Sequence, residues 1–158
     1  MKLLLIGVAA LALSAAGSAQ AQVAYTNAVL NGCYGHISTS VDDGSGQAKD
    51  VVGTLCFDGN GNILGTTGTP GLSGHVQNTD GKVKTGADET GTYAVTNTPG
   101  DGMGTMTAAC GTHEFVISHV NTNGIAQGIH FIAISSNGKC GSGTQVIGGS
   151  AEYIGPLN

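Results

Sequence analysis

The chain has no tryptophan and no arginine, and its 158 residues include only three phenylalanines and four tyrosines. Without arginine it lacks the planar guanidinium fork that proteins use to hold phosphate and carboxylate groups. The formal net charge is −5 at pH 7, whereas nucleic-acid binding requires a surface rich in lysine and arginine. We therefore expect no nucleic-acid partner, and few aromatic side chains are left for stacking on sugars or bases.

The sequence motifs of common catalytic sites are also missing. There is no G-x-S-x-G turn for a serine nucleophile, no P-loop and no dinucleotide-binding fingerprint. Beyond residue 21, no window carries apolar side chains at helical spacing, which disfavours a helical fold. We expect no cofactor, and a non-enzymatic role is favoured over an enzymatic one.

The first 21 residues have the pattern of a secretory signal peptide. Lys2 supplies a positive charge, residues 3–16 form an apolar run, and Ala19-Gln20-Ala21 matches an A-x-A cleavage site. The run is too short to span a bilayer comfortably, and no positive flank follows it. We predict cleavage after Ala21, one domain over residues 22–158 without a membrane span, and a secreted or periplasmic location.

Glycine is abundant, and many of the 28 glycines separate short runs rich in valine, isoleucine and threonine. Residues 51–67 show this best, because two apolar runs flank the hairpin-turn sequence Asp58-Gly59-Asn60-Gly61-Asn62. The same pattern predicts strands over residues 30–40, 51–57, 62–69, 90–96, 104–109, 112–120, 125–135 and 144–154. Residues 72–78 and 82–85 form either a further hairpin or a long loop.

About eight strands joined in order by short turns predict an all-β fold. A single antiparallel up-and-down β-barrel is favoured, because closing the sheet removes its exposed edges.

Four segments carry a resemblance to known proteins: Leu30-Asn31-Gly32-x-Tyr34-Gly35, Gly53-x-x-x-Phe57-Asp58-Gly59-Asn60-Gly61-Asn62-Ile63, Gly91-Thr92-Tyr93-x-Val95 and Gly104-Thr105-Met106-Thr107. In this order they resemble a group of secreted bacterial β-barrel proteins related in architecture to the calycins, the lipocalin-like and allene-oxide-cyclase-like barrels. The resemblance spans most of residues 22–158 and implies a calycin-like barrel. The group has no well-established activity, so no catalytic residue is implied, and cysteines are not part of its pattern.

Cys33, Cys56, Cys110 and Cys140 are an even set in a chain expected to be exported, which predicts disulfides. Cys33 and Cys56 fall opposite each other on the first two predicted strands, and Cys110 and Cys140 fall at one end of the barrel. We therefore predict the pairs Cys33–Cys56 and Cys110–Cys140. A metal site made by all four thiolates is disfavoured, because the C-x-x-C pairs typical of zinc and iron–sulfur ligands are missing.

The segment Asp58-x-Asn60-x-Asn62 begins like a calcium-binding loop. However, Ile63 and Thr69 stand where an EF-hand loop carries glycine and glutamate. A plain hairpin turn is the favoured interpretation, and we expect no metal.

His113 and His119 have even spacing on one predicted strand, which places them on the same face. Together with His130 on the next strand they could bind a metal or exchange protons. Glu114 is close in the sequence but points to the other face. Ordinary polar positions on strands are the favoured interpretation.

The leading functional hypothesis is an exported binding module that holds a small apolar or amphipathic ligand in the barrel mouth. The residues expected to contact this ligand are His119, Glu152, Tyr93, Phe115 and Phe131. One alternative is an extracellular structural or surface-interaction protein with a filled barrel. Another is an isomerase or cyclase of the allene-oxide-cyclase type, which would need a buried polar residue such as His119 or Glu152. The sequence leaves the oligomeric state open.

Overall fold

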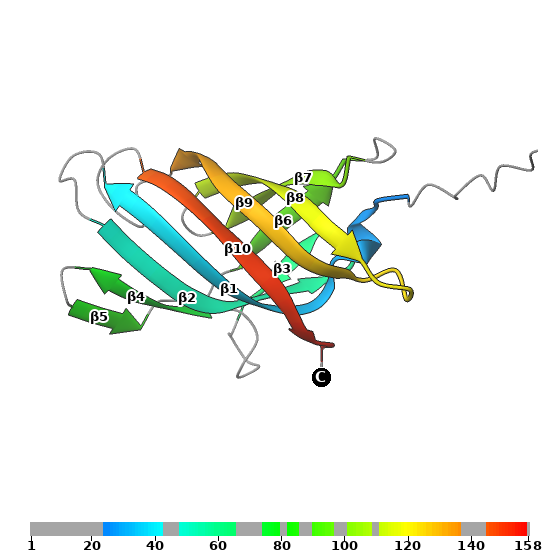
Figure 1. The fold of residues 1–158 in the computed structure, drawn as a ribbon, viewed down its shortest axis with the longest axis horizontal. Coiled ribbons are helices and arrows are strands. Elements are labelled where there is room, and N and C mark those ends of the chain that lie inside the picture. Colours follow the sequence, from blue (N-terminus) through cyan, green and yellow to red (C-terminus); the bar gives the residue numbers. More distant parts are fainter. Residues whose placement is uncertain are drawn as a thin grey trace, which may run out of the picture.

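A computed structural model describes residues 24–42, 48–65, 74–79, 82–85, 90–96, 101–108, 111–136 and 145–157. Within these ranges the chain forms a short 3₁₀ helix and ten β-strands (Figure 1). The elements are η1 (Asn27–Val29), β1 (Asn31–Asp42), β2 (Ala48–Asp58), β3 (Asn62–Leu64), β4 (Gly74–Thr79), β5 (Lys82–Thr85), β6 (Gly91–Val95), β7 (Met103–Ala108), β8 (Gly111–Val120), β9 (Ala126–Ser136) and β10 (Gln145–Gly155).

Eight of the strands close into an antiparallel up-and-down barrel. The ring runs from β1 through β2, β3, β6, β7, β8 and β9 to β10, and β10 pairs back onto β1. The predicted fold class is therefore confirmed, and the barrel is consistent with a calycin-like architecture. Closure gives each of these eight strands a partner on both sides.

The strands β4 and β5 form a hairpin outside this ring, which settles the choice between a hairpin and a loop. β4 pairs with β2 from Lys49 to Thr54, whereas β3 pairs with β2 only at Cys56 and Phe57. The edge of β2 that β3 would need for a longer strand is therefore occupied by β4. β3 runs from Asn62 to Leu64 and Gly65 is not in a strand, while residues 66–69 of the predicted strand lie outside the described residues.

The predicted hairpin turn between β2 and β3 is confirmed. Gly59 and Gly61 adopt φ angles of 76° and 106°, which favour glycine. The Asp58 Oδ1 atom accepts hydrogen bonds from the amides of Asn60 and Asn62, at 2.7 and 3.0 Å, and Oδ2 accepts one from the Asn62 side chain. Burial alone would raise the pKa of Asp58, but these hydrogen bonds outweigh it and lower the pKa. The Asp58 carboxylate thus stabilises the hairpin turn.

Apolar side chains pack together inside the barrel, and on strands such as β7 and β8 they alternate with exposed residues over much of the strand. Phe115 and Ile117 point inward from β8, as their shared face predicted. Rings from several strands also meet edge to face: the centroid of Tyr34 lies 5.5 Å from that of Tyr153 and 5.4 Å from that of Phe57. The buried cluster consists of Val29, Leu30, Tyr34, Leu55, Phe57, Ile63, Tyr93, Met106, Phe115, Ile117, Ala126, Ile129, Phe131 and Ala151.

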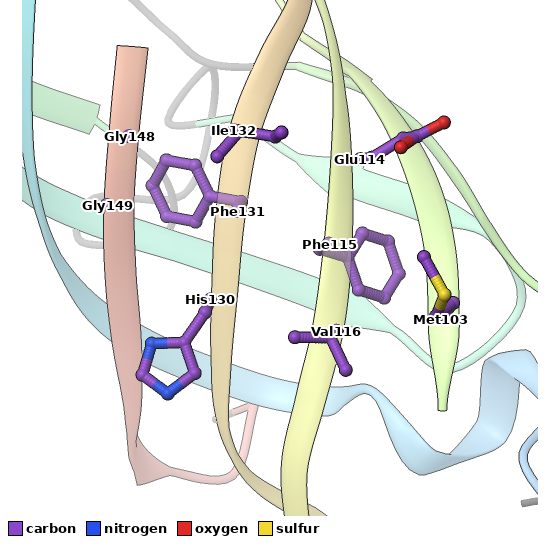
Figure 2. A pocket seen from close by; sticks show the side chains of 9 residues that line it. All are labelled: Met103, Glu114, Phe115, Val116, His130, Phe131, Ile132, Gly148 and Gly149. Atoms are coloured by element: carbon purple, nitrogen blue, oxygen red, sulfur yellow. The ribbon is translucent and has the colours of Figure 1, made fainter. Parts of the chain in front are cut away.

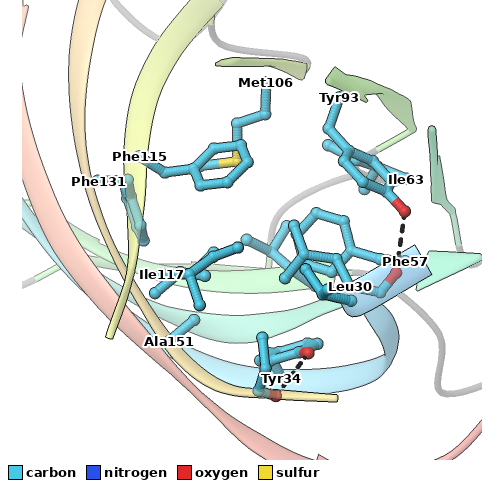
Figure 3. Packing of buried hydrophobic residues seen from close by; sticks show 14 residues of the cluster. Leu30, Tyr34, Phe57, Ile63, Tyr93, Met106, Phe115, Ile117, Phe131 and Ala151 are labelled. Atoms are coloured by element: carbon cyan, nitrogen blue, oxygen red, sulfur yellow. Dashed lines mark hydrogen bonds between the residues drawn. The ribbon is translucent and has the colours of Figure 1, made fainter. Parts of the chain in front are cut away.

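The helix η1, which the sequence analysis did not predict, packs against this core. Leu30, directly after η1, is fully buried beside Phe57 (Figure 3). The Tyr93 hydroxyl donates to the carbonyl oxygens of Leu30 and Asn27, each at 2.9 Å, and the Asn27 side chain accepts a hydrogen bond from the Val95 amide at 2.8 Å. These contacts tie η1 to β6 and fill this part of the barrel with side chains.

A disulfide joins Cys33 to Cys56, which confirms the first predicted pair. The two residues lie directly opposite each other in the β1–β2 register. Because both thiols are used in this bond, the hypothesis of a metal bound by four cysteine thiolates is wrong. Cys110 and Cys140 lie outside the described residues, so their predicted pairing stays a prediction.

Replacing both Cys33 and Cys56 by alanine should lower the free energy of unfolding by about 3 kcal/mol, because the unfolded chain loses a cross-link. Urea denaturation of both proteins measures this difference. In the presence of a reductant that opens the disulfide, most of the difference should disappear. A double variant as stable as the unaltered protein under oxidising conditions would contradict the prediction.

Alkaline pH should destabilise the barrel partly through Tyr93. Burial raises the pKa of Tyr93 to about 12, whereas an unfolded tyrosine titrates near 10. The protonated hydroxyl therefore stabilises the fold fully below pH ~10, and this contribution is lost as the pH rises toward 12.

At pH 8 the Tyr93→Phe variant should be less stable by about 1 kcal/mol, because the carbonyl oxygens of Leu30 and Asn27 lose their donor. Between pH 10 and 12 the unaltered protein should lose this advantage and become the less stable of the two, because a pKa shift of about two units outweighs about 1 kcal/mol. Urea denaturation at each pH follows the change. A difference that stays constant over this range would show that Tyr93 does not titrate with unfolding.

Candidate functional site

Four neighbouring strands, β7 to β10, carry an open hollow of about 420 Å³ (Figure 2). Its apolar side chains come from three of these strands, and two polar side chains, Glu114 and His130, stand among them. The lining residues are Met103, Glu114, Phe115, Val116, His130, Phe131, Ile132, Gly148 and Gly149.

The exposed members of this set place the hollow on the outside of the barrel. Ile132 is 58% exposed, Met103 43% and Val116 39%, and each points away from the core because its neighbours in the strand point inward. The β-sheet register puts Met103 opposite Val116 and Val116 opposite His130. An apolar surface therefore crosses three strands.

Gly148 leaves this surface open at one side. It lies opposite Ile132 in the β9–β10 register. A β-carbon added at Gly148 would meet nothing nearer than the Phe131 carbonyl oxygen, at 4.0 Å. The space beside Ile132 is therefore vacant because Gly148 has no side chain.

Below the hollow, two phenyl rings lie on the inner side of the same strands. Phe131 is paired with Gly149, and a β-carbon on Gly149 would approach the Phe131 ring to 2.7 Å and the Ile37 carbonyl oxygen to 2.5 Å. Phe115 covers Gly104 in the same way. These rings hold the backbone beneath the hollow in place by close packing.

The two polar residues define what the hollow can do chemically. Glu114 and His130 are both exposed, and they lie diagonally across β8 and β9, since Glu114 is opposite Ile132 and His130 is opposite Val116. A carboxylate beside apolar surface can hold a cation or a hydrogen-bond donor. The imidazole can donate or accept a hydrogen bond.

Two of the five predicted ligand-contacting residues, Phe115 and Phe131, line the hollow. Both are almost fully buried, so they support it from the inner side of the sheet. Tyr93 lies elsewhere, in the core, where its hydroxyl is engaged with η1. The role of these residues in binding stays a prediction.

His119 and Glu152, the two candidates for a buried polar residue, are both exposed. The expectation that His113 and His119 face the same way is wrong. An irregularity in the β8–β9 register between Ile117 and His119 interrupts the alternation, so His113 is buried while His119 is exposed.

The same irregularity groups Ser118 with His119 and Glu152 around Gly128. The Ser118 Oγ atom lies 3.3 Å from Nδ1 of His119. A β-carbon on Gly128 would lie within about 3.2 Å of both Ser118 Oγ and the Glu152 carboxylate oxygens. These side chains thus converge over bare backbone, at a place that does not line the hollow.

Inside the barrel, two histidines flank the Phe131 ring. The ring centroids of His36 and His113 lie 6.4 and 5.9 Å from that of Phe131, and both histidines are buried. Of the two, His113 is a candidate on the sequence alone and His36 is not. Among the residues described, no three His, Cys, Asp or Glu side chains are grouped as a metal site requires.

No protein-family model, curated protein or solved structure matches this chain. Within the described ranges, no helix is long and apolar enough to cross a membrane.

Sequence reasoning missed Met103, Val116, His130, Ile132 and Gly148 as residues of one site. A signal was present in the apolar residues that alternate with the core positions on the predicted strands. Such residues usually indicate a second buried face, and the sequence alone does not show which face lies inside.

Replacement by alanine should affect the stability of the protein much more at Gly149 than at the adjacent Gly148 of β10. Gly149→Ala should lower the free energy of unfolding by about 2 kcal/mol, because the new methyl group would overlap Phe131 and the β1 backbone. Gly148→Ala should change it by less than about 0.5 kcal/mol, because the space there is open. Thermal and urea denaturation measure both. Equal effects would contradict the proposed packing of Phe131 on Gly149.

Proposed function

We propose that this protein is an exported, non-enzymatic binding module that holds a small apolar or amphipathic ligand in the hollow on β7 to β10. The observation that carries the proposal is the hollow itself. Its volume of about 420 Å³ falls in the range typical of small-molecule sites, and its lining is mainly apolar. Few polar groups among apolar side chains are what an amphipathic ligand requires.

The outer hollow is a better position than the lumen near η1 for such a ligand. In that part of the barrel the side chains of Leu30, Tyr34 and Phe57 are fully buried, so protein atoms occupy the space. By contrast, Met103, Val116 and Ile132 are exposed at one place on the surface. Contact with a ligand would remove this apolar area from water.

Export is part of the proposal. The Cys33–Cys56 disulfide is compatible with an oxidising extracellular or periplasmic location. The signal-peptide pattern supports the same view, although residues 1–21 lie outside the described residues. Membership of the secreted calycin-like group is likewise proposed, on the strength of the sequence motifs and of a barrel consistent with that architecture.

A second candidate is an extracellular surface-interaction protein. Large apolar side chains outside the hollow favour it, since Ile154 is 62% exposed and Ile37 58%. An isomerase or cyclase receives no support from the position of His119 and Glu152, which are exposed and do not line the hollow.

The two exposed isoleucines of β9 provide a matched test. Ile132 lines the hollow, whereas Ile134 has the same orientation and a similar exposure but does not line it. With the neutral apolar dye N-phenyl-1-naphthylamine as probe, Ile132→Ser should raise the dissociation constant about ten-fold, because apolar contact is lost. Ile134→Ser should leave it within about two-fold.

A third variant, Gly148→Leu, should abolish dye binding by filling the open space beside Ile132. Circular dichroism and urea denaturation would confirm that each variant is folded. The proposal fails if the unaltered protein does not bind the dye, or if Ile132→Ser and Ile134→Ser weaken binding equally.

A further inference from the structure

The hollow contains one residue that carries charge at neutral pH, the exposed Glu114. We propose that the hollow selects amphipathic cations: an apolar body lies against Met103, Val116 and Ile132, and an ammonium group lies against the Glu114 carboxylate. This inference rests on the proposed function and adds to it the chemical class of the ligand.

The register places the carboxylate at the border of the apolar surface. Glu114 is opposite Ile132 on one side and Thr105 on the other, and Val116 is the next outward residue along β8. Outward residues two positions apart on a strand are separated by about 7 Å. A ligand with an apolar chain and a terminal amine can therefore contact Val116 and Ile132 while its amine reaches Glu114.

The distribution of lysine favours a cationic ligand. The strands β7 to β10 contain no lysine. Lys49 lies on β2, across the ring from β8, and Lys82 and Lys84 lie on β5, beyond β2. Within the described residues, no lysine lies on the strands around Glu114; Lys139 lies outside the described residues.

The remaining charges act in the same direction. Glu152, on the outer surface of β10, adds a second negative charge to this side of the barrel, and the whole chain carries a formal net charge of −5. An anionic ligand would gain no lysine partner from the described strands β7 to β10, and it would meet the like charge of Glu114. Apolar anions should therefore bind more weakly than apolar cations.

Competition against N-phenyl-1-naphthylamine at pH 8 and low salt tests this selectivity with ligands of equal chain length. The probes are octylammonium, octan-1-ol and octanoate. Octylammonium should displace the dye at a concentration about five-fold lower than octan-1-ol, and octanoate should be the weakest of the three. Raising the salt concentration should reduce the difference between octylammonium and octan-1-ol.

Glu114→Gln should remove the preference for octylammonium over octan-1-ol, with the dye affinity of each variant measured first so that the competition is compared on the same scale. Glu152→Gln is the matched control, since it removes the same charge from the same side of the barrel but outside the hollow. It should retain most of the preference.

The outcomes separate the two proposals. If the dye does not bind the unaltered protein, the proposed function fails and the selectivity fails with it. If the dye binds, but the three probes compete equally or Glu114→Gln keeps the preference, the selectivity is overturned while the binding function stands. Equal loss in Glu114→Gln and Glu152→Gln would also overturn it, because it would indicate diffuse attraction by net charge.

Discussion

The barrel depends on phenyl rings that lie against the bare backbone of a glycine on the neighbouring strand. Phe131 covers Gly149 and Phe115 covers Gly104, and in both pairs the ring occupies the place that a β-carbon would need. A chain without tryptophan has few large side chains with which to fill its interior. Glycine lowers strand propensity, but here it lets each ring cover more of the sheet, and the packing compensates.

The hollow is the outer side of the same arrangement. Side chains alternate between the two faces of a strand, so fixing Phe131 inward fixes Ile132 outward, and fixing Gly149 inward fixes Gly148 outward. A register slip of one residue would exchange these faces and bring Ile132 against the core. The position of the candidate site is therefore set by the packing of the core, although the site lies outside it.

Much of the fold could be predicted because turn residues act locally. Asp58 and its glycine and asparagine neighbours mark a hairpin wherever it occurs, and the Cys33–Cys56 pair followed from that strand order. The features that failed depend on contacts distant in sequence. β4 pairs with β2 beside the two positions that pair with β3, and η1 is held by the Tyr93 hydroxyl from β6.

The site was harder to predict than the fold because the outward positions of β7 to β9 also carry apolar residues. Val116 and Ile117 are both apolar and adjacent in the sequence. Which of them points into the closed barrel depends on the pairing of all its strands, and in the structure Ile117 is buried while Val116 is exposed. Apolar residues on both faces of a strand leave the buried face undecided in the sequence. In the structure, the isoleucine and valine on the outer face gather at one hollow, where their exposure to water is unfavourable. Such a surface is retained at a cost to solubility. Under the proposed function, contact with an apolar ligand would remove this surface from water, and the open space at Gly148 would leave room for it.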